Sequence, residues 1–183
     1  MTGYRERVEM KYLARWMVLW SLVSGPLPAA ELWVTLENVR SSEGKLLVAL
    51  HNNAETYATD SDFASDGFQA YAWQVVEPRS PETRLHFADI PAGRYAVSGF
   101  HDENGDRRLN RQIFPLTGMP SEPYVISNNG VLMFGKVRFE DALFEIREPR
   151  TEIRISVAQH LERLRDALLK EREENSVEPS QIH

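Results

Sequence analysis

Apolar and polar side chains alternate along most of the chain between residues 32 and 157. This two-residue repeat is typical of strands that bury one face. It predicts strands at residues 32–39, 46–50, 70–76, 84–87, 94–100, 142–147 and 153–157. Turn residues separate these runs, and no helical pattern alternates with them. About seven short strands in this arrangement predict an all-β, antiparallel β-sandwich, with a small closed barrel as the alternative.

The composition of three connections predicts the kind of turn or loop that each forms. The turn Ser41–Gly44 is expected to join the first two strands into an antiparallel hairpin. Residues 51–69 are rich in Asp, Asn and Ser, which predicts a long loop with a short helical turn. In the turn 89–93, Pro91 restricts its own φ and Gly93 is expected to supply a positive φ.

Beyond residue 157 the hydrophobic repeat changes to a helical one. Leucines recur at three- and four-residue spacing, at Leu161, Leu164 and Leu168, with Leu169 beside them. This spacing predicts an amphipathic helix over residues 158–174, within a charged C-terminal segment 158–183. The leucines are expected to pack on the sheet or to stay partly exposed. Self-association through the helix 158–174 is the alternative, although the apolar stripe is narrow for a coiled coil.

The first 30 residues have the pattern of a signal peptide. A basic region precedes the apolar run 16–25, and small residues follow it, with cleavage expected after Ala29 or Ala30. Met10 is a plausible true start. The apolar run is well short of the roughly 20 residues that a membrane span needs. We therefore predict export to the periplasm or beyond and a mature β domain over residues 31–157; a retained anchor is the alternative.

Composition narrows the possible functions. The chain has 183 residues, which suits one domain, and no cysteine, which excludes disulfides, thiolate metal sites and cysteine nucleophiles. Its net charge is −6. An acidic chain without a basic cluster in its domain repels phosphate backbones, so nucleic acid is not an expected partner.

The segment after the turn 89–93 carries a family resemblance. The pattern consists of Pro91, Gly93, Tyr95, Phe100 to Gly105, Gly118, Pro120, Glu122, Ser127-Asn128-Asn129 and Phe139-Glu140-Asp141-Ala142, with Gly44 to Leu50 upstream. Over residues 32–157 the chain resembles the bacterial domain-of-unknown-function family 2141. The resemblance implies an exported protein with a prealbumin-like sandwich, similar to transthyretin-like or carboxypeptidase-regulatory-like domains, and it implies no established activity. The chain departs from the family pattern at residues 106–110 and in its helical tail.

Oxygen-bearing side chains are spaced like calcium ligands in the bend after strand 94–100. Asp102, Asn104, Asp106 and Asn110 stand at positions one, three, five and nine of such a loop. Against this, Arg107 stands at position six, where glycine is expected, and it should resist the sharp turn. The bend therefore either binds a calcium-like cation or is closed by local hydrogen bonds to its own backbone. No other cofactor is predicted.

The sequence gives weaker support to transition-metal sites and to catalytic or phosphate-binding motifs. His51, His86 and His101 do not have the spacing of a transition-metal site. No serine-nucleophile motif or glycine-rich phosphate loop is present. The leading hypothesis is a non-enzymatic binding or structural module.

Two alternatives remain open. The first is a carbohydrate- or peptide-binding domain that uses the aromatics of residues 57–73, which are Tyr57, Phe63, Phe68, Tyr71 and Trp73. The second is a hydrolase that uses loop carboxylates, with Glu103 and either Glu122 or Asp141 as the pair.

Overall fold

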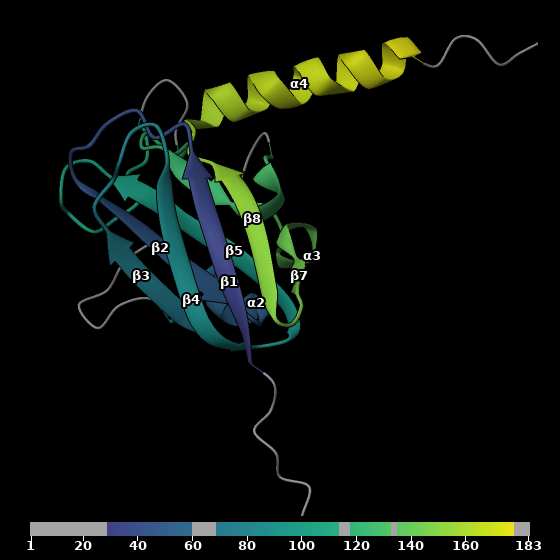
Figure 1. Cartoon of the computed structure of the whole chain (residues 1–183). Coiled ribbons are helices and arrows are strands. Elements are labelled where there is room, and N and C mark those ends of the chain that lie inside the picture. Colours follow the sequence, from purple (N-terminus) through teal and green to yellow (C-terminus); the bar gives the residue numbers. More distant parts are fainter. Residues whose placement is uncertain (1–28, 60–68, 114–117, 133–134, 178–183) are drawn as a thin grey trace, which may run out of the picture.

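Two β-sheets face each other, and a long helix projects from one end of the molecule (Figure 1). The computed structural model describes residues 29–59, 69–113, 118–132 and 135–177. The strands are β1 (Ala29–Glu37), β2 (Lys45–His51), β3 (Ala72–Val76), β4 (Thr83–Pro91), β5 (Gly93–Asp102), β6 (Tyr124–Ile126), β7 (Phe144–Ile146) and β8 (Arg150–Ser156). The helices are α2 (Ala54–Ala58), the 3-10 turn η1 (Ser127–Asn129), α3 (Phe139–Ala142) and α4 (His160–Val177).

The first sheet, sheet A, has three strands in the order β4-β1-β8. β1 is antiparallel to β4 but parallel to β8, with Leu36 beside Ile155. The prediction of a wholly antiparallel sandwich is therefore wrong for this sheet. Side-chain alternation is the same for both strand directions, so the sequence repeat does not encode the parallel pairing.

The second sheet, sheet B, has the order β3-β2-β5-β6, and β7 also pairs with β5. β1 and β2 therefore lie in different sheets, and the predicted hairpin between residues 32–39 and 46–50 is wrong. Both edges of β1 are already occupied, by β4 and β8, which leaves no place for β2. Residues 38–44 cross between the sheets instead, and Val39 within them is buried and bonds through its amide to the Pro81 carbonyl, at 3.0 Å.

The turn between β4 and β5 also differs from its prediction. Asp89, and not Gly93, has the positive φ, at 57°. Aspartate tolerates this left-handed conformation better than most residues do, because its short side chain bonds locally. β4 continues past this residue to Pro91, with a register shift in its pairing with β1 between Ala30 and Leu32.

Apolar side chains fill two separate cores. The larger lies between the sheets and includes Leu36, Val48 and Val97. The smaller covers the outer face of sheet B beneath α2 and α3, and it includes Tyr57 and Phe100. β5 contributes to both cores and is buried on both faces over most of its length. Burial of a side chain such as Phe100 stabilises the fold by about 2 to 3 kcal/mol.

α4 is anchored at its first turn and projects beyond the sheets (Figure 1). The helix prediction is confirmed, and of its two branches the structure favours partly exposed leucines: Leu164 is half-buried, and the other three are exposed. Leu161, Leu168 and Leu169 are 56%, 56% and 50% exposed. Self-association through residues 158–174 stays a prediction.

Residues 1–28, which carry most of the predicted signal peptide, lie outside the described residues. The expected junction at residues 30/31 falls within β1, where Ala30 is buried and pairs with Ile90. Export stays a prediction. No helix in the described part of the chain combines the length and the apolar character needed to cross a bilayer.

Candidate binding cavity

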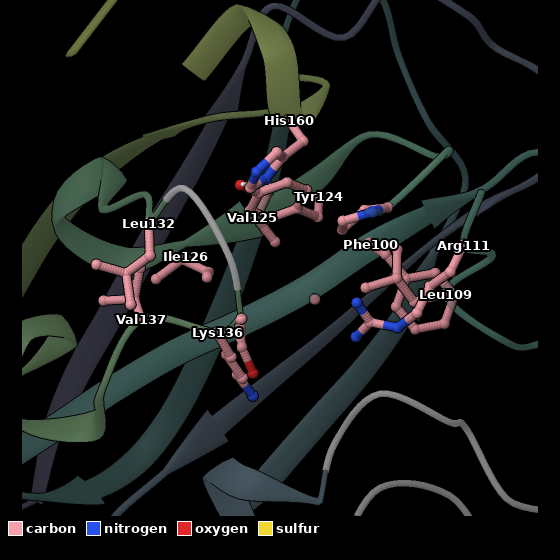
Figure 2. Close-up of a pocket in the computed structure, with 14 residues that line it drawn as sticks. Phe100, Leu109, Arg111, Tyr124, Val125, Ile126, Leu132, Lys136, Val137 and His160 are labelled. Carbon is pink, nitrogen blue, oxygen red and sulfur yellow. Dashed lines mark hydrogen bonds between the residues drawn. The ribbon is translucent and has the colours of Figure 1, made fainter. Parts of the chain in front are cut away.

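A cavity of about 60 Å³ opens on the outer face of sheet B, beside the smaller core (Figure 2). β5 and β6 form its floor, and residues 109–111 and 135–137 stand around it with the first turn of α4. Its apolar lining consists of Phe100, Leu109, Pro120, Tyr124, Val125, Ile126, Leu132 and Val137. The cavity is thus a small apolar space built from segments that are distant in the sequence.

Gly99 lies in the floor of this cavity and allows two strands to pack closely. A Cβ at this position would lie 2.2 Å from the Leu47 carbonyl oxygen in β2 and 3.0 Å from Val125 Cγ2. Any larger residue would therefore push β5 away from β2 or β6. Glycine here keeps the floor flat and the strands in register.

The two cations at the cavity, Arg111 and Lys136, are held differently. The Lys136 ammonium lies 3.8 Å from the centre of the Tyr57 ring and donates to the Tyr57 carbonyl. It therefore points out of the cavity, and its aliphatic stem forms part of the wall. The Arg111 guanidinium extends toward the open middle of the site (Figure 2) and donates from Nη1 to the Gly118 carbonyl, at 2.9 Å.

Backbone hydrogen bonds fix the segment that carries Arg111. The Ser121 amide donates to the Asn110 carbonyl and the Gln112 amide to the Met119 carbonyl, both at 2.8 Å. Arg111 itself forms an isolated bridge with Pro120. Residues 110–112 and 119–121 are therefore paired, and they form the two sides of an arch that carries Arg111.

Tyr124 connects the cavity to α4. Its hydroxyl lies 3.0 Å from His160 Nδ1, and its carbonyl accepts a hydrogen bond from Arg163 Nη2 at 2.8 Å. Burial raises the pKa of the Tyr124 hydroxyl, and the nearby Arg163 charge partly offsets this. Burial likewise lowers the pKa of the Arg163 guanidinium, whose Nε and Nη1 have no hydrogen-bond partner among the described residues. Sequence reasoning missed these contacts, because it considered only the leucines of the helix and not its buried His160 and Arg163.

The four predicted calcium ligands lie in one bend, and three of their side chains bond to the bend's own backbone. Asp102 is buried, and its two oxygens accept from the amides of Gly105 at 2.8 Å and Arg107 at 2.9 Å. Asn104 accepts from the Asp106 amide at 3.0 Å, and Asp106 from the Arg108 amide at 2.9 Å. These are the local hydrogen bonds that the alternative interpretation of the bend predicts.

Arg107 does not resist the turn, contrary to expectation. Its φ is 61°, in the left-handed region, and the hydrogen bond from its amide to Asp102 holds it there. No group of three or more His, Asp or Glu side chains that could hold a metal ion occurs among the described residues. A calcium ion bound by Asp102, Asn104, Asp106 and Asn110 stays a prediction.

Glu122, on the arch that carries Arg111, holds the bend 102–110 through two backbone hydrogen bonds. It is 6% exposed, and its two oxygens accept from the amides of Glu103 at 3.2 Å and Asn110 at 2.9 Å. Burial raises the pKa of the Glu122 carboxyl, and the charges of Asp102 and Asp106 add to this effect. Asp141, the other proposed acid, pairs with Arg138 at 2.9 Å. Both carboxylates considered as partners of Glu103 thus make structural contacts.

The three histidines considered as metal ligands have separate partners. His86 stacks on Trp33 at 4.3 Å, and His101 Nε2 lies 2.7 Å from the Glu43 carbonyl. His51 Nδ1 lies 3.2 Å from Thr56 Oγ1, and its Nε2 lies 3.1 Å from Ser98 Oγ. The serine and histidine are both buried, and a threonine stands where a catalytic triad has a carboxylate. We therefore interpret this chain of contacts as a structural link between β2, α2 and β5.

The predicted aromatic loop is divided in the structure. Tyr57 is 2% exposed and packs edge-on against His51, so it belongs to the smaller core. Phe63 and Phe68 lie outside the described residues. Tyr71 and Trp73 are 41% and 44% exposed near the edge strand β3. A carbohydrate- or peptide-binding surface at these two residues stays a prediction.

Ser127, Asn128 and Asn129, which belong to the family pattern, use their side chains to hydrogen-bond backbone groups of other segments. Ser127 Oγ accepts from the Val97 amide at 3.0 Å, and Asn129 Oδ1 accepts from the Ser156 amide at 2.8 Å. Asn128 donates to the carbonyls of Asp141 and Leu143, both at 3.0 Å. The three residues therefore join β5, the end of α3 and β8.

Comparison with known proteins agrees with the resemblance seen in the sequence. Residues 34–154 match the family described as uncharacterised proteins conserved in bacteria, domain-of-unknown-function family 2141. The matched residues run from β1 to β8 and leave α4 outside. No curated protein and no solved structure matches the chain. The chain therefore belongs to the bacterial domain-of-unknown-function family 2141.

Proposed function

We propose that this domain is a non-enzymatic binding module that holds the apolar part of a small ligand in the cavity on the outer face of sheet B. The observation that carries the proposal is the cavity itself. Apolar side chains line most of it, and it opens at the surface beside Arg111. A concave apolar site with a few polar groups is the usual form of a small-ligand site.

The floor and walls of the cavity favour binding without rearrangement. Floor residues come from β5 and β6, which are hydrogen-bonded in sheet B, and Phe100 is 1% exposed. The Arg111 segment is closed by backbone hydrogen bonds, and His160 is placed by its contact with Tyr124. A site built on paired strands loses little conformational entropy when a ligand enters.

The side chains with acid-base potential at the cavity support a binding role rather than catalysis. Ser98 pairs with the buried His51, the Lys136 ammonium lies over Tyr57, and the His160 ring contacts Tyr124. Each is therefore engaged in a contact that supports the fold. A binding site needs only shape and apolar surface from them.

The test is to narrow the cavity mouth and measure binding of a neutral aromatic probe, benzamide, by NMR chemical-shift titration. Leu132 lines the cavity and is 42% exposed, so Leu132→Trp should obstruct it and weaken binding at least several-fold. Leu168→Trp on α4 makes the same substitution at an exposed leucine outside the cavity, and it should bind like the unmodified protein. Shifts that do not saturate, or that avoid the cavity residues, would refute the proposal.

A further inference from the structure

We propose that the cavity selects a small carboxylate ligand, one that joins a compact apolar group to an anionic end, and that Arg111 receives the carboxylate. This inference rests on the proposed function, because it assigns a ligand class to the same cavity. It also gives Arg111 a role in selecting the ligand, which binding to the apolar lining alone does not need.

The charge around the cavity is unlike that of the chain as a whole. The protein has a net charge of −6, yet none of the described residues that line the cavity is acidic. The lining does contain Arg111 and Lys136. Because like charges repel and opposite charges attract over these short distances, the cavity favours an anion over a cation.

Arg111 has no carboxylate partner among the described residues, and of the arginines without one it is the one that lines the cavity. Arg138 pairs with Asp141, Arg147 with Glu145, and Arg154 with both Glu37 and Glu82. The Arg111 guanidinium makes one hydrogen bond in this part of the chain, to the Gly118 carbonyl. A guanidinium carries five N–H donors, so most of them remain available to a ligand.

The position of Arg111 suits a carboxylate. The hydrogen bond from Nη1 to Gly118 fixes one corner of the guanidinium, and the planar group extends over the cavity in Figure 2. Arginine and carboxylate have matching planar geometry and form short, charge-assisted hydrogen bonds. Lys136 is less suited, because its ammonium is already placed over the Tyr57 ring.

The two parts of such a ligand would meet different surroundings. Its apolar group would lie against Phe100, Ile126 and Val137 in the floor and wall. Its carboxylate would remain at the rim, because Arg111 is exposed there. This division avoids the large cost of burying a charge without water. The cavity volume of about 60 Å³ is smaller than a benzene ring, so a ring would fill the cavity and extend into its open mouth.

The test compares benzoate with benzamide, which have the same ring and nearly the same shape but differ in charge. We expect the unmodified protein to bind benzoate about fivefold more tightly, as one exposed charge pair allows. Arg111 lines the same cavity, so Arg111→Gln can change the affinity for both probes, but it should lower the benzoate affinity several-fold more than the benzamide affinity and so remove most of the preference. Arg108→Gln, which removes the same charge from an exposed residue outside the cavity, should keep the preference.

The outcomes separate the ligand class from the proposed function. Equal affinity for benzoate and benzamide in the unmodified protein would overturn the carboxylate assignment and leave the binding module standing. A preference that survives Arg111→Gln would overturn the role of Arg111. Failure of both probes to bind would overturn the binding module as well.

Discussion

Two buried carboxylates, Asp102 and Glu122, organise the loops at the end of β5. Each uses both carboxylate oxygens to accept hydrogen bonds from backbone amides. A carboxylate that accepts two amides holds a loop in one conformation, because losing it leaves two donors without partners. These residues therefore act on the loop that precedes Arg111.

Replacing Asp102 by alanine should lower the free energy of unfolding by about 2 kcal/mol, because the amides of Gly105 and Arg107 lose their acceptor. Asp102→Asn keeps one acceptor oxygen and should lose less. Chemical denaturation measures both losses, and we expect the same values in calcium and in a chelator. A rise in the melting temperature with calcium that disappears in Asp102→Ala would show instead that a cation occupies the bend.

The stability contributed by Glu122 should depend on pH. Its pKa in the folded protein is raised above the ordinary value of 4.5, mainly by burial. The folded state therefore holds the proton more tightly than the unfolded state does. This contribution is complete below pH 4.5 and is lost as the pH rises through the folded pKa.

The neutral variant Glu122→Gln isolates this effect. Relative to that variant, the unmodified protein should be more stable in acid than near neutrality, as measured by denaturation at several pH values. A difference that stays constant with pH, or that grows toward neutrality, would contradict the raised pKa.

At the scale of elements, α4 is joined to the sheets by polar contacts at its first turn. Arg163 is 5% exposed and donates to the carbonyls of Tyr124 and Ser156, and Glu162 pairs with Arg40 at 2.5 Å. The exposed leucines farther along contribute little to this attachment. Docking of α4 therefore depends on buried hydrogen bonds more than on an apolar stripe.

We expect Arg163→Ala to lower the free energy of unfolding by about 2 kcal/mol, since the buried Tyr124 carbonyl and the half-buried Ser156 carbonyl lose a charged donor. Leu168→Lys, at an exposed position on the same helix, should change it by less than about 0.5 kcal/mol. Thermal and chemical denaturation of the two variants measure the contrast. A larger loss in Leu168→Lys would mean that the leucines hold the helix after all.

Strand positions could be predicted from the sequence more readily than strand partners. The two-residue repeat located β2, β3, β5 and β8 within a few residues, because burial of one face imposes it directly. It could not reveal that β1 and β2 belong to different sheets, or that β8 runs parallel to β1. Those features depend on which edges are free when the sheets assemble.

The bend 102–110 and the cavity also differ in how far the sequence could predict them. The hydrogen bonds of Asp102, Asn104 and Asp106 join residues within five positions of one another, so local side-chain chemistry could predict them. The cavity brings together Phe100, Tyr124, Val137 and His160, whose proximity depends on the whole fold. No local pattern in the sequence distinguishes these residues from an ordinary core.

Across the whole molecule, β5 connects the structural and the proposed functional parts. One face of it packs in the core between the sheets, and the other supports the smaller core and the cavity. Its far end leads into the bend that Asp102 closes. The cavity floor is therefore held by a strand that is buried over most of its length, while the residues around the cavity mouth come from surface segments.

The most direct test of the binding module is an isotope-filtered NMR experiment on the unmodified protein with benzoate. We expect intermolecular nuclear Overhauser effects between the ring protons and the methyl groups of Ile126, Leu132 and Val137, which line the cavity. Effects confined to exposed methyl groups elsewhere, such as those of Val75 or Leu168, or none at saturating ligand, would contradict the proposed site.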